Sequence, residues 1–109
     1  IAWGYVPLFY WFSERFPATR FFWSDLLTGR IPGTKGKGSD AFIMPKAWDM
    51  FMEDMERNKP VYIVDTAPSN LHDYRDFPVT RYPVLMDYMN RHYREETRIN
   101  GTVFYKRTD

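Results

Sequence analysis

The stretch Val61-Tyr62-Ile63-Val64-Asp65-Thr66 decides the fold that this sequence predicts. It is a continuous run of β-branched and aromatic residues between Asn58-Lys59-Pro60, which ends a helical pattern, and a segment of turn residues. Such runs are typical of a central parallel strand, which is buried because helices cover both faces of its sheet. The sequence therefore predicts an α/β domain built around this strand.

A helix is expected immediately before this strand, from a cap at Ser39 or Asp40 to about Asn58. Apolar residues recur on one face, and charged residues largely occupy the other. A methionine-rich stripe can form a promiscuous binding groove, but we interpret this one as core packing against the sheet. The stripe comprises Met44, Trp48, Phe51, Met52 and Met55.

Two further elements are expected after the strand. A third helix spans Tyr82 to Tyr93, with Pro83 in its first turn and an apolar stripe along one side. The ending from Glu95 to Arg107 places Asn100-Gly101 between two alternating segments, which is the strongest short signal for a β-hairpin. This hairpin would add an antiparallel pair to the sheet.

The amino-terminal block is unusually aromatic, since residues 1–23 hold ten of the chain's 21 aromatic residues. Ile1 to Gly4 is expected to end a strand, and Pro7 to Phe16 to form a helix with Leu8, Trp11, Phe12 and Arg15 on one stripe. Thr19 to Trp23 is rich in β-branched and aromatic residues and is expected to be a second strand. We interpret the block as the start of the α/β core.

The order of these elements predicts one layered α/β domain over residues 1–109. It would contain three helices and a mixed sheet of about five strands, closed by the C-terminal antiparallel hairpin. A chain of 109 residues suits a single domain with a modest core. An apolar start without an initiator methionine leads us to expect a fragment of a larger protein.

Composition excludes several classes of partner and site. A net charge of +1 gives no field strong enough to argue for nucleic acid or anionic lipid, and the absence of cysteine rules out disulfides and thiolate metal sites. The longest strongly apolar run, Tyr5 to Phe12, has eight residues, whereas a membrane-spanning helix needs about 20. No signal peptide pattern is present.

Residues 24–38 carry four of the six glycines and are expected to form a long loop. The spacing from Gly33 to Gly38 imitates a phosphate-binding loop, but Ser39 stands where that motif requires lysine. Gly36-x-Gly38-x-x-Ala41 imitates a dinucleotide fingerprint without a strand leading into it. We therefore favour a flexible basic linker over a nucleotide site.

Candidate ligand-binding residues lie at the carboxyl ends of the expected strands, where open α/β sheets bind ligands. Trp3 and Tyr5 would approach Asp65 and Thr66 there, if the first strand runs parallel to the strand at 61–66. Asp65 can equally well cap the following loop in an Asx turn. The opening block also contributes two candidate polar ligand-binding residues, Arg15 and Arg20.

Catalytic and metal sites have no candidate in this sequence. His72 and His92 lack partners at metal-ligand spacing and are expected on the surface. No serine occupies a nucleophile elbow, and no pair of carboxylates suggests an acid and a base. Asn100-Gly101-Thr102 matches a glycosylation sequon, but the hairpin turn already explains it. We expect no catalytic residue, metal or cofactor.

Five segments carry a resemblance to a known family. They are W-G-Y-x-P (Trp3–Pro7), Y-W-F-S-E-R-x-P-A-T-R-F (Tyr10–Phe21), N-K-P-V-Y-I-V-D-T-A-P (Asn58–Pro68), F-P-V-T-R-Y-P-V-L-x-x-Y (Phe77–Tyr88) and I-N-G-T-V-F-Y-K-R (Ile99–Arg107). Together they resemble the C-terminal soluble region of bacterial polytopic membrane glycosyltransferases that are protein mannosyltransferase-like or aminoarabinose transferase-like. Such enzymes transfer a sugar from a polyprenyl-phosphate carrier, with catalytic acidic residues in a loop after the first membrane helix. No position of this chain corresponds to that loop.

The resemblance implies an extracytoplasmic, non-catalytic accessory domain of a membrane glycosyltransferase, at the outer side of a bacterial membrane. Its partners would be the membrane-embedded part of the same polypeptide and an acceptor glycan. Two alternatives remain open: an independent soluble α/β module that binds a nucleotide or another ligand, and a protein-interaction domain. Solvent-facing aromatic residues clustered at the end that holds Trp3, Tyr5 and Asp65 would favour sugar binding, and a contiguous exposed apolar patch would favour an interaction domain.

Overall fold

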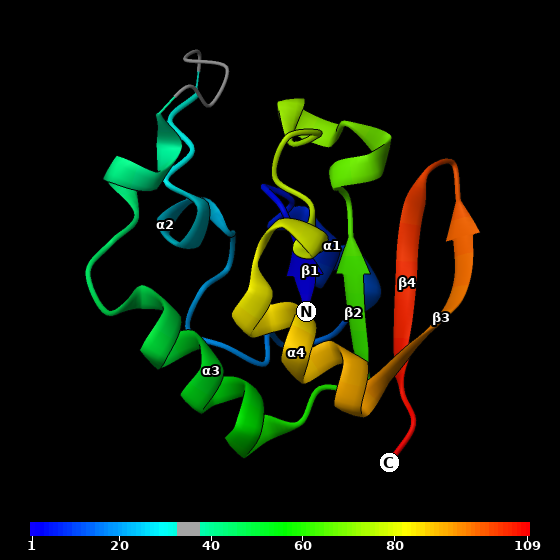
Figure 1. The fold of residues 1–109 in the computed structure, drawn as a ribbon. Helices are drawn as coiled ribbons and strands as arrows, with labels where there is room; N and C mark the ends of the chain where they lie inside the picture. Colours follow the sequence, from blue (N-terminus) through cyan, green and yellow to red (C-terminus); the bar gives the residue numbers. More distant parts are fainter. Residues whose placement is uncertain (33–37) are drawn as a thin grey trace.

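The computed structural model describes residues 1–32 and 38–109. The predicted α/β class is confirmed, with a four-stranded mixed sheet rather than one of about five strands, and with four α-helices in the described ranges (Figure 1). The elements are β1 (Ala2–Trp3), α1 (Leu8–Ser13), α2 (Asp25–Thr28), α3 (Ala47–Asn58), β2 (Tyr62–Asp65), α4 (Pro83–His92), β3 (Tyr93–Ile99) and β4 (Thr102–Arg107).

β2 occupies the centre that its sequence predicted. The strand order is β1-β2-β4-β3, with β1 parallel and β4 antiparallel to β2. The register pairs Val64 with both Ala2 and Phe104, so these three side chains share one face of the sheet. The other face carries Trp3, Asp65 and their neighbours at alternate positions.

The second face is the core face, covered by α3 and α4. Trp3, Phe51 of α3 and Tyr88 of α4 are almost completely buried there. Trp3 packs against Trp48 and Tyr82, with ring centroids 5.9 and 5.4 Å away. The predicted apolar stripes of α3 and α4 therefore form the core, where most of the burial energy is gained.

The opposite face of the sheet is only partly covered. α1 lies on this side, behind the sheet in Figure 1, whereas α4 lies in front of it. The Tyr10 hydroxyl of α1 accepts a hydrogen bond of 2.8 Å from the Ala2 backbone N–H, which fixes the helix over β1. Towards β4 the open face is hollowed by two grooves, described below.

The predicted hairpin is confirmed. β3 and β4 pair antiparallel around Asn100 and Gly101, whose φ angles of 50° and 85° are those of a type I′ turn. The register shifts between Glu95 and Thr97, which leaves one extra residue in β3. A bulge of this kind lets β3 twist away from the flat sheet.

The strand predicted at Thr19 to Trp23 is wrong, since this segment is irregular. Its backbone donors are bound by side chains: the Arg20 N–H donates to Asp54 (2.8 Å) and the Phe21 N–H to the Thr19 hydroxyl (3.3 Å). Directly after β1, the Gly4 N–H donates to the Ser24 hydroxyl. The segment therefore runs beside β1 without pairing with it as a fifth strand.

The helix predicted from Ser39 or Asp40 to Asn58 is two elements. A 3₁₀ helix at Ser39–Phe42 is followed by a break, and α3 begins only at Ala47. Pro45 disfavours helical geometry in the residue before it, and Lys46 adopts a left-handed conformation with φ of 62°. Three short 3₁₀ helices (Ala67–Ser69, Leu71–Asp73 and Val79–Arg81) lie in the segment of turn residues between β2 and α4.

α1 is shorter than the predicted span of Pro7 to Phe16, and its apolar stripe does not face the core. Trp11 and Phe12 are each 78% exposed and Leu8 is 65% exposed, whereas Tyr10 is the buried residue. The chain leaves the helix at Glu14, which adopts a left-handed conformation three residues before Pro17. The interpretation of this stripe as core is therefore wrong, and the helix presents large apolar side chains to solvent.

Within the described ranges, no helix has the length and apolar character required to cross a membrane.

Candidate functional site

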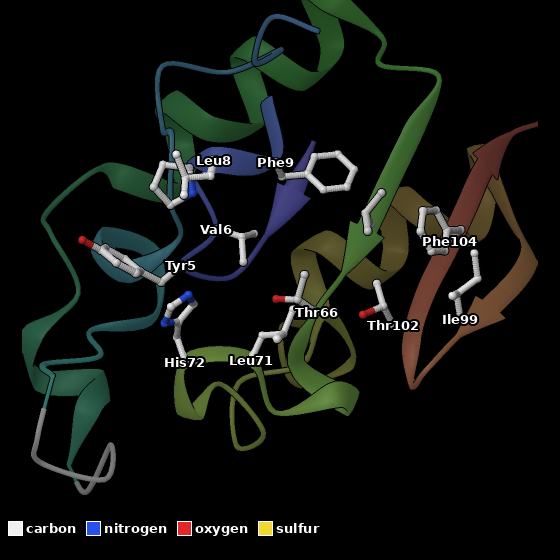
Figure 2. A pocket seen from close by; sticks show the side chains of 12 residues that line it. Tyr5, Val6, Leu8, Phe9, Thr66, Leu71, His72, Ile99, Thr102 and Phe104 are labelled. Carbon is white, nitrogen blue, oxygen red and sulfur yellow. The ribbon is translucent and has the colours of Figure 1, made fainter. Parts of the chain in front are cut away.

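The open face of the sheet contains a groove beyond the carboxyl ends of β1 and β2, which we call the carboxyl-end groove. It is a cavity of about 470 Å³ and its walls are almost entirely apolar. Figure 2 shows Tyr5, Leu8 and Phe9 on one side and the hairpin on the other, with Thr66 between them. The hairpin wall consists of Ile99, Thr102 and Phe104, and the loop after β2 adds Leu71 and His72.

A second groove of about 640 Å³ adjoins the first along the same face. The two share Phe9, Val64 and Phe104, so they form one continuous depression between α1 and the hairpin. The second groove is more polar, since Glu14, Arg15 and Glu96 contribute to its lining. On this face β2 and β4 carry apolar side chains, Val64 and Phe104 among them. Of the described helices, only α1 packs on this face, so the depression stays open.

Gly4 turns the chain from β1 into the groove wall. Its φ of 128° is rarely adopted by other residues, and a Cβ built on it would lie 2.2 Å from the Thr66 hydroxyl oxygen. Ser24 holds the turn, because its hydroxyl accepts from the Gly4 N–H and its own N–H donates to the Gly4 carbonyl at 2.9 Å. This turn brings Tyr5 to the surface.

Three ring side chains, which we call the aromatic cluster, lie together at this end of the groove: Tyr5 and His72, which line it, and Trp23, which contacts Tyr5. The Tyr5 ring centroid lies 5.7 Å from that of Trp23 and 5.7 Å from that of His72. Tyr5 is 36% exposed and Trp23 is 40% exposed. In the described ranges, the His72 ring has no hydrogen-bond partner, although its backbone carbonyl accepts from Arg30. The cluster thus combines exposed aromatic faces with one free imidazole.

A partly buried ion pair supports the cluster from below. Arg30 Nη1 lies 3.3 Å from Asp25 Oδ2, and the two side chains are only 9% and 13% exposed. The Arg30 guanidinium lies 6.0 Å from the Tyr5 ring centroid and 5.3 Å from that of Tyr74, and it also donates to the His72 carbonyl. Burial raises the pKa of Asp25, an effect opposed by hydrogen bonds from Tyr74 and Arg30. Arg30 therefore ties Tyr5 and the His72 loop together.

Trp3, which we expected at the site, is a core residue. It is fully buried, and its indole N–H donates to the Phe77 carbonyl at 2.7 Å. β1 does run parallel to β2, as the site prediction required. However, alternation along β1 directs Trp3 to the core face while Tyr5, beyond the turn, reaches the groove.

Asp65 serves the loop that follows β2. Its Oδ1 accepts from the Ala67 N–H at 3.0 Å and its Oδ2 from the Val79 N–H at 3.1 Å. Burial raises the pKa of the carboxyl, and both backbone hydrogen bonds oppose that change. The Asx-turn interpretation accounts for Asp65, which is almost completely buried.

Thr66 is buried at the floor of the groove. Its hydroxyl donates to the Trp3 carbonyl at 2.7 Å, which links the ends of β1 and β2. Of the two other expected residues, Arg15 lines the second groove. Arg20 lies elsewhere, where its guanidinium binds both carboxylate oxygens of Asp54 on α3.

The structure thus brings Tyr5 and Thr66 together in the carboxyl-end groove, and separates them from Trp3, Asp65 and Arg20. Sequence reasoning missed two members of the site. Trp23 was assigned to a strand, and His72 was expected to be a plain surface residue. Arg30, which contacts both Tyr5 and the His72 carbonyl, lies 25 residues after Tyr5 and 42 before His72 in the chain, so no local pattern could indicate that these two residues meet.

The chemistry available in the carboxyl-end groove is that of binding. Among its lining residues, Tyr5 and His72 carry the only titratable side chains, and neither contacts a carboxylate there. The described residues contain no cluster of three or more His, Asp or Glu side chains able to hold a metal ion. The other histidine, His92, pairs with Asp109 at 2.7 Å on the far side of the hairpin base. Apolar walls with an aromatic rim suit a ligand with an apolar face.

The basic glycine-rich loop considered as a nucleotide site falls mainly on residues 33–37, which lie outside the described residues.

Comparisons of the chain with protein-family models, curated proteins and solved structures found no match.

Proposed function

We propose that this chain is a non-catalytic accessory domain that binds a glycan at the aromatic cluster. The observation that carries the proposal is the exposure of Tyr5 and Trp23 side by side at the mouth of an open groove. Sugar rings present C–H groups on one face, and aromatic side chains with exposed faces are suited to stack against them. His72 can supply a hydrogen bond to a sugar hydroxyl.

The resemblance in sequence sets the biological context of the proposal. In that context the domain belongs to a bacterial polytopic membrane glycosyltransferase that uses a lipid-linked sugar, and lies on the extracytoplasmic side. It would position the acceptor glycan for the membrane-embedded part of the same polypeptide, which carries the catalytic residues. No nucleic acid or cofactor is part of this role.

The arrangement favours glycan binding over the nucleotide-binding alternative. Phosphate sites in α/β domains use a helix N-terminus or cationic side chains. Apart from His72, the described residues that line the carboxyl-end groove have apolar or hydroxyl-bearing side chains, and Arg30 beneath it is already engaged by Asp25 and by the His72 carbonyl. Among these described lining residues, a phosphate would therefore find no lysine or arginine.

The direct test is calorimetric titration of the chain with trisaccharides of glucose, mannose and N-acetylglucosamine. At least one should bind weakly, with a dissociation constant in the millimolar range or below. Tyr5→Ala and Trp23→Ala should each weaken binding about fivefold or more, since exposed aromatic contacts contribute roughly 1 kcal/mol. Trp11→Ala is the matched control, because Trp11 is an exposed aromatic residue on α1 and should leave the affinity unchanged. Binding that survives both cluster variants would contradict the proposal.

A further inference from the structure

The carboxyl-end groove, next to the aromatic cluster, has walls that offer a sugar ring few hydrogen-bond partners. Eight of the twelve residues that line it have purely hydrocarbon side chains. Thr66 and Thr102 contribute hydroxyls, but a hydroxyl has only one hydrogen to donate. Thr66 donates its hydrogen to the Trp3 carbonyl at 2.7 Å, and Thr102 donates to the Ser69 hydroxyl at 3.1 Å. Neither threonine therefore has a donor left for a ligand.

A sugar ring is better placed at the aromatic cluster than inside the groove. It carries hydroxyls around its edge, and each hydroxyl that is buried without a partner costs free energy. At the cluster the ring can stack on Tyr5 and Trp23 while its hydroxyls stay in water. Tyr5 and His72 belong both to the cluster and to the groove lining (Figure 2). A group attached to the bound sugar can therefore enter the groove directly, and an apolar group suits its walls.

The charge and the size of the groove narrow the choice of that group. Among the described residues that line the groove there is no Lys, Arg, Asp or Glu, and the Arg30 guanidinium beneath it is engaged by Asp25. Glu14, Arg15 and Glu96 line the second groove instead. The volume of about 470 Å³ lies within the range of about 300–1,000 Å³ that is usual for small-ligand sites. These features fit a short, uncharged hydrocarbon group.

We propose that the ligand of the aromatic cluster is a neutral glycoside whose aglycone, the non-sugar part, is an alkyl or aryl group that occupies the carboxyl-end groove. The inference rests on the proposed function, because it presupposes that a sugar stacks on Tyr5 and Trp23. Contact of the aglycone with Leu71, Ile99 and Phe104 would remove apolar surface from water on both sides, and this burial favours binding. The sugar fixes the position of the ligand, and the aglycone adds affinity.

Calorimetric titration with the methyl, butyl and hexyl glycosides of glucose, mannose and N-acetylglucosamine tests this inference. For at least one sugar, affinity should rise roughly two- to threefold with each methylene added to the aglycone. The hexyl phosphodiester of the same sugar should bind more weakly than its hexyl glycoside, because its phosphate would lie against apolar walls without a cation. 1-Hexanol, which lacks the sugar, should also bind more weakly than the hexyl glycoside.

Ile99→Asp places a charge in the wall of the groove and should remove the gain in affinity from methyl to hexyl glycoside, while the methyl glycoside binds as before. The fold should tolerate this change, since Ile99 is 56% exposed. Val84→Asp is the matched control, because Val84 is 47% exposed but lies on α4, on the other side of the sheet, and it should change neither affinity.

The titrations separate failure of this inference from failure of the proposed function. Equal affinity for methyl and hexyl glycosides, a gain that survives Ile99→Asp, or tighter binding of the hexyl phosphodiester would overturn the aglycone inference and leave the glycan site standing. Binding of 1-hexanol as tight as that of the hexyl glycoside would show an apolar site without a sugar requirement and would overturn both proposals. Absence of binding by every glycoside would also overturn both.

Discussion

The guanidinium of Arg20 donates hydrogen bonds to both carboxylate oxygens of Asp54, with Nε 2.9 Å from Oδ2 and Nη2 2.8 Å from Oδ1. The Arg20 backbone N–H donates to the same carboxylate, and Arg57 of α3 approaches it at 2.6 Å. Asn58 adds a hydrogen bond to the Ala18 carbonyl. Polar contacts with α3 therefore hold the irregular segment 17–23 in place. A strand at this position would instead have been held by backbone hydrogen bonds to a neighbouring strand.

Asp54→Ala should lower the free energy of unfolding by about 2 kcal/mol. The variant removes charge-assisted hydrogen bonds and leaves the Arg20 backbone N–H without its partner. Glu53→Ala is the control, since Glu53 is exposed and lies 3.7 Å from Arg20, and surface pairs of this kind contribute little. Urea denaturation measures both, and equal losses in the two variants would contradict the role of Asp54.

Asp54 should also make stability depend on pH at the acid end. Hydrogen bonds from Arg20 lower its pKa from an ordinary 3.8 to about 2. A pKa lowered in the folded state contributes stability that is complete above about 3.8 and is lost as the pH falls through about 2. The stability difference between the unchanged chain and Asp54→Asn should therefore shrink between pH 5 and pH 2. A difference that stays constant over this range would show that the Asp54 charge does not matter.

Gly4→Ala should destabilise the fold by roughly 2 kcal/mol, because it combines a positive φ with a Cβ placed 2.2 Å from the Thr66 hydroxyl oxygen. Gly38→Ala should cost less, since Gly38 also has a positive φ but no atom within 4 Å of the added Cβ. Thr66→Ala removes the clashing hydroxyl, so Gly4→Ala should be less harmful in that background. Additive effects in this double-mutant cycle would argue against the clash.

Arg30→Leu should destabilise the chain by roughly 2–3 kcal/mol, because Asp25 would be left partly buried without its cation. It should also loosen the aromatic cluster, since Arg30 contacts Tyr5 and binds the His72 carbonyl. Arg98→Leu, which breaks an exposed pair with Glu95, should change stability little. Thermal denaturation and the Tyr5 ring resonances measure the two effects, and unchanged resonances would contradict the supporting role of Arg30.

Local patterns predicted the central part of the fold. The run at 61–66, the stripe of α4 and the Asn100-Gly101 turn each carry their structural signal within a few residues. The segment at 19–23 could not be predicted, because its backbone is satisfied by Asp54, 34 residues away. The orientation of α1 could not be predicted either, since a short apolar stripe does not reveal whether other elements pack against that face of the helix.

The candidate site was partly predictable for a similar reason. Parallel pairing of the first strand with the strand at 61–66 was enough to place Tyr5 near Thr66. The pairing alone does not show which side chains face the core. Trp3 and Asp65 were therefore expected at the site, although the strand register buries both of them. Trp23 and His72 join Tyr5 through tertiary contacts alone.

The most direct test of the proposed glycan site is to follow the four tryptophan indole N–H signals by NMR during titration with the trisaccharide that binds best. Trp3 and Trp48 donate to the Phe77 and Leu27 carbonyls, and their signals should not move. The Trp23 signal should shift in proportion to saturation, and that of Trp11 on α1 should stay in place. A shift confined to Trp11, or no shift of Trp23 at saturating sugar, would contradict the proposed site.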